Sequence, residues 1–311
     1  MKKIIFINFL FTILLLFCVE FFFRYILNYN VQGISKNIIT NNGEFEFNNK
    51  NIKKGKAFGA NIYTDSNGFR IPKKFKRKNL NQILFIGGSI TFGVAVKSEN
   101  TFVEKLNQNS DFMIINASVM GSTLNNNYKI LSKFYNKEKT NKVFVSLALD
   151  DFDDATNNHP VSLKKVLKSI KIFSNINSFL IKKSAAYVFF KLYLINPRKE
   201  YYLRELSAFK NPEILVKFNS TLDKFSGYRD KIIFYIIPYA EQVTSQECVN
   251  NDISQKIFER ELSNRNLKFI NLKRYFCEQK NTKKLFLMND PAHLSKKGHQ
   301  LVFSILKNYI Y

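Results

Sequence analysis

The chain has 311 residues, and its 48 Lys and Arg residues against 24 Asp and Glu residues give a formal net charge of +24. This length suits one large domain or two small ones. A basic surface favours anionic partners. However, no clustered arginine helix, zinc-ligand spacing or RNA-binding aromatic signature accompanies the charge, so nucleic acid is not expected as a partner. The excess is mostly lysine in a chain rich in Asn, Ile and Phe, a composition that an A/T-rich genome would impose.

The N-terminal stretch is apolar over about the length of a membrane span. Residues 4–23 contain only three polar side chains, and about 20 apolar residues cross a bilayer. A cleaved signal peptide would be shorter and would end in small residues, whereas bulky aromatic residues follow here. Lys2 and Lys3 favour a cytoplasmic N-terminus with the rest of the chain exported. We therefore expect residues 1–27 to form a single-pass membrane anchor.

Composition divides the rest of the chain. Residues 28–56 are polar and rich in Asn and Lys, which is typical of a tether with little core. Asn67-Gly68 is a turn signal followed by Phe69 and Arg70, and we expect the folded domain, residues 57–311, to begin in this region.

Short apolar runs alternate with helical patterns in the expected folded domain. The runs are residues 83–86, 112–117, 142–149, 231–238 and 267–272. A helix is expected at Thr101, where Thr-x-x-Glu resembles a capping box, and others after Ser122, near residue 252 and after Ser295. Strands separated by helices predict an α/β fold, with a central parallel sheet covered by helices on both faces.

A basic insertion at about residues 155–211 interrupts this alternation. Residues 161–210 hold 11 Lys and Arg residues but only two acidic ones, and apolar residues recur at helical spacing from Leu163 to Phe173. Such a helix would lie on an anionic membrane or cover a site as a lid. The alternative is an ordinary helix with a solvated lysine face. Residues 179–194 are apolar but contain three lysines, so they make a poor second span.

The three cysteines do not form a metal-binding pattern. Cys18 lies within the apolar stretch, whereas Cys248 and Cys277 lie in the part expected to be exported. These two either form a disulfide in an oxidising compartment or remain as buried thiols. No pair of cysteines has metal-ligand spacing, so no metal site is expected.

Residues 82–93 are the stretch around which the chain is organised. The apolar run 83–86 ends at Gly87-Gly88, and Ser89 follows at once. Glycines let the backbone turn sharply and let another molecule come close. The carboxyl edge of a central strand is where open α/β sheets place ligands. Ser89 is therefore a candidate nucleophile, and the alternative is a tight turn with a serine helix cap.

A nucleophilic serine needs a base, and the chain has three histidines. His159 lacks an orienting carboxylate nearby, and His299 lies in the last predicted helix, where a surface role is expected. His293 follows Asp290 by three residues, so one turn brings the carboxylate to the imidazole. The aspartate would fix the tautomer while the other ring nitrogen takes the Ser89 proton. Asp-x-x-His is alternatively a metal pair or a helix cap.

Acyl transfer also needs hydrogen-bond donors for the developing oxyanion. The Ser89 amide is one candidate. Gly121, after the second predicted strand, is another, unless it is a plain glycine at the start of a helix. A third donor is expected at the end of the third predicted strand.

Four short motifs together resemble a known family, the SGNH (GDSL-type) serine esterases and acyltransferases. They are Gly87-Gly88-Ser89, Asn116 to Gly121-Ser122, Asp150-Asp151, and Asp290-Pro-Ala-His293, in the family's order. The resemblance extends from about Tyr63 to the C-terminus. The Asn67-Gly68-Phe69-Arg70 segment is similar to the membrane-attached, exported branch.

The resemblance implies a three-layer, flavodoxin-like α/β/α domain with a Ser89, His293 and Asp290 triad. It places Gly121 and Asp150 at the oxyanion or substrate, and it implies no cofactor and no metal. The implied activity is an esterase acting on O-acyl, most simply O-acetyl, esters of cell-surface glycans outside the cytoplasm. The alternatives are an O-acyltransferase with the same triad, a lipid-acting esterase, and a non-catalytic glycan-binding scaffold.

Two residues depart from the family's pattern. Gly88 replaces the usual aspartate before the nucleophile, and Asp150 stands where an asparagine normally donates to the oxyanion. An ionised carboxylate cannot donate a hydrogen bond. Either Asp150 is protonated, or two donors suffice, or the protein is not a competent esterase.

Overall fold

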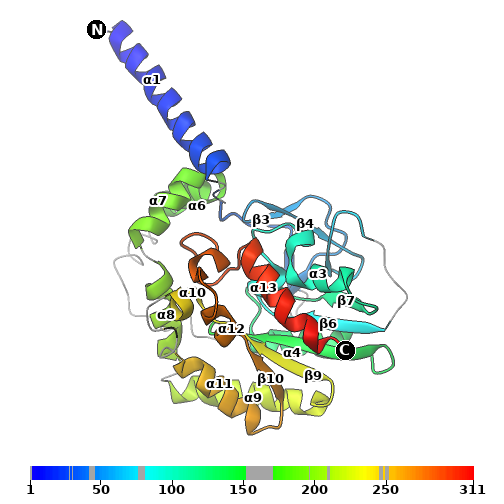
Figure 1. Ribbon diagram of the computed structural model, residues 1–311. Helices are drawn as coiled ribbons and strands as arrows, with labels where there is room; N and C mark the ends of the chain where they lie inside the picture. Colours follow the sequence, from blue (N-terminus) through cyan, green and yellow to red (C-terminus); the bar gives the residue numbers. More distant parts are fainter. Residues whose placement is uncertain are drawn as a thin grey trace.

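The computed structural model describes residues 2–27, 29, 31–41, 46–75, 81–151, 171–195, 197–208, 211–244, 248 and 252–311. At its centre lies an eight-stranded sheet in the order β10-β9-β8-β6-β7-β5-β4-β3 (Figure 1). The strands are β3 Gly55–Ala57, β4 Ala60–Thr64, β5 Arg70–Ile71, β6 Gln82–Ile86, β7 Met113–Asn116, β8 Thr140–Leu147, β9 Ile232–Ile236 and β10 Lys268–Asn271.

The five strands β10-β9-β8-β6-β7 are parallel, which confirms the predicted sheet. Each predicted apolar run overlaps one of these strands, because a strand covered on both faces is apolar almost throughout. β5, β4 and β3 extend the sheet beyond β7, each strand antiparallel to the one before it in the sheet, and they were not predicted. The chain leaves β6 toward β7 and later returns to β8 on the other side of β6. The order therefore reverses at β6, and ligands bind at the carboxyl ends of strands at such a point.

Helices cover both faces of the sheet, as predicted. Helices α3 (Phe102–Gln108) and α13 (Lys296–Leu306) pack together, whereas α4 (Leu124–Phe134) packs against α9 (Pro212–Phe225). α9 also contacts α11 (Ile253–Ser263) through the tilted rings of Phe218 and Phe258, whose centroids are 5.6 Å apart. Right-handed crossovers place the first pair on one face and the other three on the opposite face. Thr101 and Ser295 cap α3 and α13 with their hydroxyls, so both expected helix starts are confirmed.

The prediction of a polar tether at residues 28–56 is wrong for the described part of that stretch. β1 (Ile39–Asn41) and β2 (Glu46–Asn48) form a two-stranded sheet. Ile38 and Ile52 are buried in a cluster with Phe92, which is the last residue of the short helix α2 (Ser89–Phe92). A few isoleucines among many Asn and Lys residues supply this core, and average composition conceals them. The segment thus supports the turn that carries Ser89.

Helix α1 (Lys2–Phe21) projects from the body of the molecule (Figure 1). Together with the π-helical turn η1 (Phe22–Ile26), it is long and apolar enough to cross a membrane, and a signal sequence would meet the same criterion. Within the described residues, the insertion after β8 contains three helices: α6 (Lys171–Lys183), α7 (Ala185–Ile195) and α8 (Pro197–Ala208). The amphipathic pattern predicted from Leu163 begins outside the described residues.

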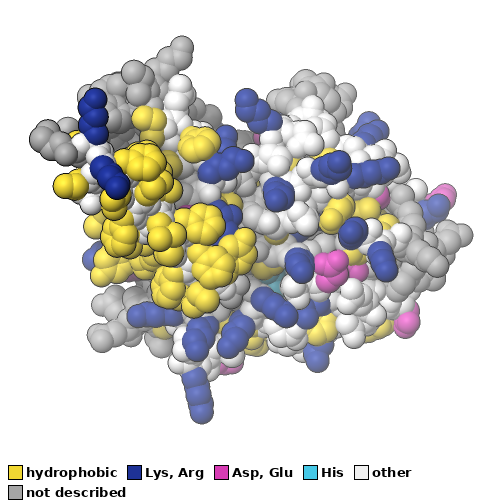
Figure 2. Space-filling model, turned by 90° about the horizontal axis from the view of Figure 1, so that it is seen from above, with side chains coloured by type: hydrophobic (Ala, Val, Ile, Leu, Met, Phe, Trp, Pro, Cys, Tyr) yellow, Lys and Arg dark blue, Asp and Glu magenta, His cyan; other side chains and the backbone are white. Residues whose placement is uncertain are grey.

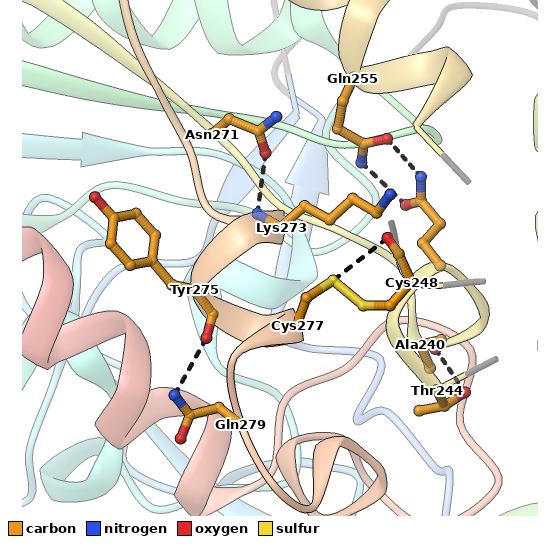
Figure 3. The surroundings of a disulfide bond; sticks show 10 residues. Ala240, Thr244, Cys248, Gln255, Asn271, Lys273, Tyr275, Cys277 and Gln279 are labelled. Atoms are coloured by element: carbon orange, nitrogen blue, oxygen red, sulfur yellow. Dashed lines mark hydrogen bonds between the residues drawn. A yellow bond between two sulfur atoms is a disulfide. The ribbon is translucent and has the colours of Figure 1, made fainter. Parts of the chain in front are cut away.

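Cys248 and Cys277 form a disulfide, with their Cα atoms 6.0 Å apart. It ties the chain between α10 (Ala240–Thr244) and α11 to α12 (Lys273–Cys277), as Figure 3 shows. Of the two alternatives left open by the sequence, the structure therefore has the disulfide. Cys18 is a free, exposed cysteine in α1.

Candidate active site

Ser89 lies at the first turn of α2, directly beyond the carboxyl end of β6. The turn requires a glycine at position 87, because a Cβ atom there would overlap the Ser146 hydroxyl on the adjacent strand β8. The far end of α2 is held by Arg70, whose buried guanidinium donates to the carbonyls of Phe92, Gly93 and Val96. In the sequence, Arg70 stands out only as part of a turn motif. Its contacts show that it fixes the helix carrying Ser89.

Asp290 and His293 lie in the loop before α13 and meet Ser89 across the edge of the sheet. The Asp290 Oδ1 atom accepts hydrogen bonds from the backbone N–H groups of Ala292 (2.9 Å) and His293 (2.7 Å). The Oδ2 atom is 2.9 Å from His293 Nδ1, and His293 Nε2 is 2.9 Å from Ser89 Oγ. The structure therefore brings the three predicted residues into one hydrogen-bonded chain.

The charges of this pair support each other. Burial alone would raise the pKa of Asp290, but the neighbouring His293 ring and two backbone donors lower it below its usual value. Burial alone would lower the pKa of His293, but Asp290 holds it above its ordinary value of 6.5, with a smaller contribution from Asp150. Asp290 therefore remains ionised. The His293 ring keeps its proton up to a higher pH than a histidine with an ordinary pKa does.

Two residues from outside the sheet hold the loop that carries Asp290. Arg198, in α8, donates to the carbonyls of Asp290 (3.1 Å) and Leu287 (3.1 Å). Tyr29, just after the N-terminal helix, donates its hydroxyl proton to the carbonyl of Met288 (3.1 Å). Neither residue was predicted from the sequence, because a single arginine in a basic stretch and a single tyrosine carry no signal of a distant partner.

A pocket opens beside Ser89 at the carboxyl ends of β6 and β8. Ser89, Gly121, Asp150 and Asp151 all line it. Gly121 has φ +75°, a left-handed conformation that favours glycine, and no atom lies within 4 Å of its hypothetical Cβ position. Among the described residues, the N–H groups of Ser89 and Gly121 donate to no protein acceptor. Both are therefore free to donate to a bound molecule.

The two adjacent aspartates have different surroundings. Asp150 is exposed at the mouth of this pocket, whereas the side chain of Asp151 is buried and accepts a hydrogen bond from the Ala148 N–H (2.7 Å). Burial, with a contribution from the charge of Asp150, raises the pKa of Asp151 well above its usual value. A protonated carboxyl is therefore favoured at Asp151.

Position 88 has room for a side chain. The nearest atoms to a Cβ there are the Ser122 carbonyl at 3.7 Å and Asp151 Oδ1 at 3.8 Å. A Cβ atom therefore fits there, and an aspartate would bring a second carboxyl near Asp151.

The other histidines do not reach the pocket in the described part of the chain. His299 is fully buried rather than on the surface as expected, and its ring stacks on Phe102. Burial and the charge of Arg70 lower its pKa to about 3, so it is a neutral core residue. His159 lies outside the described residues. Within the described ranges, no three His, Cys, Asp or Glu side chains form a group suited to a metal ion.

Comparison with known proteins gives structural likenesses only. No family model matches the chain, and no curated protein matches it. A lipase/acylhydrolase from Enterococcus faecalis is 14% identical with a TM-score of 0.42, over 74% of this chain and 95% of that one. A lipolytic G-D-S-L protein from Veillonella parvula is 12% identical with a TM-score of 0.44, over 74% and 97%. An acetyl xylan esterase from Geobacillus stearothermophilus is 15% identical with a TM-score of 0.42, over 74% and 95%. Because these values are low, we argue function from the geometry of the site.

Proposed function

We propose that this protein is an SGNH (GDSL-type) ester hydrolase in which Ser89, His293 and Asp290 form the catalytic triad. His293 Nε2 removes the Ser89 proton as Oγ bonds to the ester carbonyl carbon. The N–H groups of Ser89 and Gly121 donate to the resulting oxyanion. His293 then protonates the leaving alcohol as its bond to carbon breaks, which leaves an acyl-serine. Water, deprotonated by the same ring, attacks the acyl carbon. The bond from that carbon to Ser89 Oγ then breaks, His293 returns the proton to Oγ, and the acid is released.

The observation that carries this proposal is the hydrogen-bonded chain from Asp290 through His293 to Ser89. Ser89 and His293 are separated by 204 positions in the sequence. A glycan-binding scaffold would need neither this juxtaposition nor a carboxylate held by two backbone donors. The pocket beside Ser89 also offers two free N–H groups, so Asp150 need not donate.

The proposed substrates are short O-acyl groups, most simply O-acetyl groups, on cell-surface glycans. The lining of the pocket includes the small residues Gly88, Gly121 and Ala148 beside Ser89, which leaves space for a short acyl group. We propose that α1 stays attached as a membrane anchor, with Lys2 and Lys3 in the cytoplasm and the folded domain outside. The disulfide suits an oxidising compartment. The same acyl-serine would serve a transferase if a sugar hydroxyl replaced water.

The test compares the full-length protein in detergent with Ser89→Ala and with the exposed control Ser263→Ala. The assay follows hydrolysis of para-nitrophenyl acetate. Loss of a triad nucleophile lowers kcat by about 10⁶ in a serine hydrolase. We therefore expect Ser89→Ala to be inactive and Ser263→Ala to match the parent. Equal rates for parent and Ser89→Ala would end the catalytic proposal. With an acetylated glycan and a deacetylated acceptor, the appearance of acetate or of a newly acetylated sugar separates hydrolysis from transfer.

A further inference from the structure

We propose that α6 and α7 form a second membrane contact, lying in the headgroup region beside α1. The contact surface consists of five large side chains that are at least half exposed. These are Ile176 and Phe179 on α6, and Phe190, Tyr193 and Leu194 on α7, with exposed fractions of 51, 62, 50, 68 and 80%. An apolar surface of this kind on a folded protein marks an interaction site. The inference rests on the proposal that α1 crosses the bilayer.

Helix α7 is packed on one side and exposes large apolar side chains on the other. Phe190, Tyr193 and Leu194 recur at helical spacing on one side of α7, while Ala185 and Val188 on the other side are buried against Phe23 and Tyr29. The helix therefore has a packed inner face and an apolar outer face. A surface helix normally presents polar residues outward, so the outer face of α7 calls for an apolar neighbour.

The attachment of α7 to α1 fixes where α7 lies relative to the proposed bilayer. The Glu20 carboxylate accepts hydrogen bonds from the N–H groups of Ala185 (2.9 Å) and Ala186 (3.2 Å) and from the Ser184 hydroxyl (2.8 Å). It thereby caps the first turn of α7. The same carboxylate pairs with Arg24, whose guanidinium also donates to the Lys183 carbonyl (2.6 Å). The start of α7 therefore lies at the level of Glu20 along α1.

That level is the surface of the bilayer. Helix α1 has 20 residues, and a rise of 1.5 Å per residue gives about 30 Å, the thickness of the hydrocarbon core. If Lys2 marks one boundary, Glu20 and Phe21 lie at the other. Phe23 lies just beyond it, with its ring centroid 4.5 Å from that of Phe189 and 5.3 Å from that of Phe190. The outer face of α7 is therefore held where acyl chains meet headgroups.

The composition of this surface suits the headgroup region rather than a second copy of the chain. Aromatic side chains such as Phe190 and Tyr193 concentrate at membrane interfaces. Lys182 and Lys183 are exposed at the junction of α6 and α7, where an ammonium group reaches anionic headgroups. Figure 2, which looks down onto the α1 side, shows hydrophobic side chains gathered there with lysines and arginines around them. The apolar surface lies beside the proposed span, because α7 packs against η1 and the end of α1.

The chain contains no tryptophan, so a single introduced tryptophan reports on one position. The variants are Leu194→Trp on α7, Phe179→Trp on α6, Phe9→Trp in α1, and Val216→Trp on α9. Phe9 and Val216 are 60 and 67% exposed and serve as the span and body controls. Each full-length variant is reconstituted in vesicles of phosphatidylcholine and phosphatidylglycerol. The acyl chains are brominated either near the headgroup or at mid-chain, and bromine quenches nearby tryptophan.

We expect Leu194→Trp and Phe179→Trp to lose fluorescence mainly with bromine near the headgroup. Phe9→Trp should be quenched mainly by mid-chain bromine, and Val216→Trp by neither. Quenching of Phe9→Trp without any quenching on α6 or α7 would overturn the inference and leave the anchor intact. Absence of quenching at all four positions would overturn the anchor as well. If Leu194→Trp is instead shielded by protein self-association in the vesicles, the surface belongs to a second copy and the inference is wrong.

Discussion

Replacing Asp290 by asparagine tests the roles of the two carboxylate oxygens separately. Oδ1 accepts from two backbone N–H groups, whereas Oδ2 faces His293 Nδ1. An asparagine keeps one oxygen and gains one NH₂ group. If its oxygen stays on the backbone donors, the NH₂ group faces Nδ1 and donates to it. The ring then carries its proton on Nε2, so this nitrogen can no longer accept the Ser89 proton.

The opposite amide orientation restores the productive tautomer but leaves both backbone donors facing an NH₂ group. A buried donor without a partner costs about 1–3 kcal/mol, so this orientation is disfavoured by about 2–6 kcal/mol for the two donors. At 1.4 kcal/mol per factor of ten, the productive fraction falls by a factor between about 30 and 10⁴. The equivalent change in a serine protease triad lowers kcat by about 10⁴. We therefore expect kcat to fall by about 10³–10⁴ in Asp290→Asn.

The measurement is the initial rate of para-nitrophenyl acetate hydrolysis by the full-length protein at pH 8. Asp230→Asn, at an exposed position, is the matched control and should be unchanged. Circular dichroism and thermal denaturation establish that Asp290→Asn is folded. Asp290→Ala, which removes the amide that traps the tautomer, should be no less active per folded molecule than Asp290→Asn. A folded Asp290→Asn variant that keeps its rate within about tenfold of the parent would refute the assigned orientation.

Three further measurements test the site and its support. Because Asp290 holds the pKa of His293 above 6.5, kcat/KM should rise with pH through an apparent pKa above 6.5; a midpoint at or below 6.5 would contradict the pairing. Gly87→Ala should lower the free energy of unfolding by about 1–3 kcal/mol, since its Cβ overlaps Ser146; unchanged denaturant stability would count against the tight turn. Breaking the disulfide by Cys277→Ser opens a loop with a sequence separation of 29 and should cost about 3–4 kcal/mol; a Tm insensitive to this change and to reductant would exclude the bond.

The attachments around the Asp290 loop link the proposed membrane contacts to the proposed chemistry. Arg198 from the insertion and Tyr29 from the segment after α1 both donate to carbonyls of this loop. The Asp290 loop is therefore held by residues that follow closely after α1 and after α7 in the chain.

The local sequence was enough to predict the five parallel strands and to single out Ser89, His293 and Asp290, which the structure joins in one hydrogen-bonded chain. A buried strand must be apolar along its length, and a nucleophile at a strand end must follow small residues. Asp290 and His293 are three residues apart, so their contact is decided within one turn. These features depend on residues that are close together in the chain, so they can be predicted from short stretches of sequence.

Long-range packing decided the rest. Ile38 and Ile52 lie in a polar stretch and become core only because Phe92 and Ala57 pack against them. His299 is polar yet fully buried, since α13 lies on α3. Burial separates Asp151 from Asp150, although the two are adjacent and chemically identical in the sequence. Glu20 reads as a stray charge at the end of an apolar run, and only the fold brings it to the first turn of α7, some 164 positions away. Contacts between residues this far apart depend on how whole helices and strands pack together, and a local sequence pattern does not predict that packing.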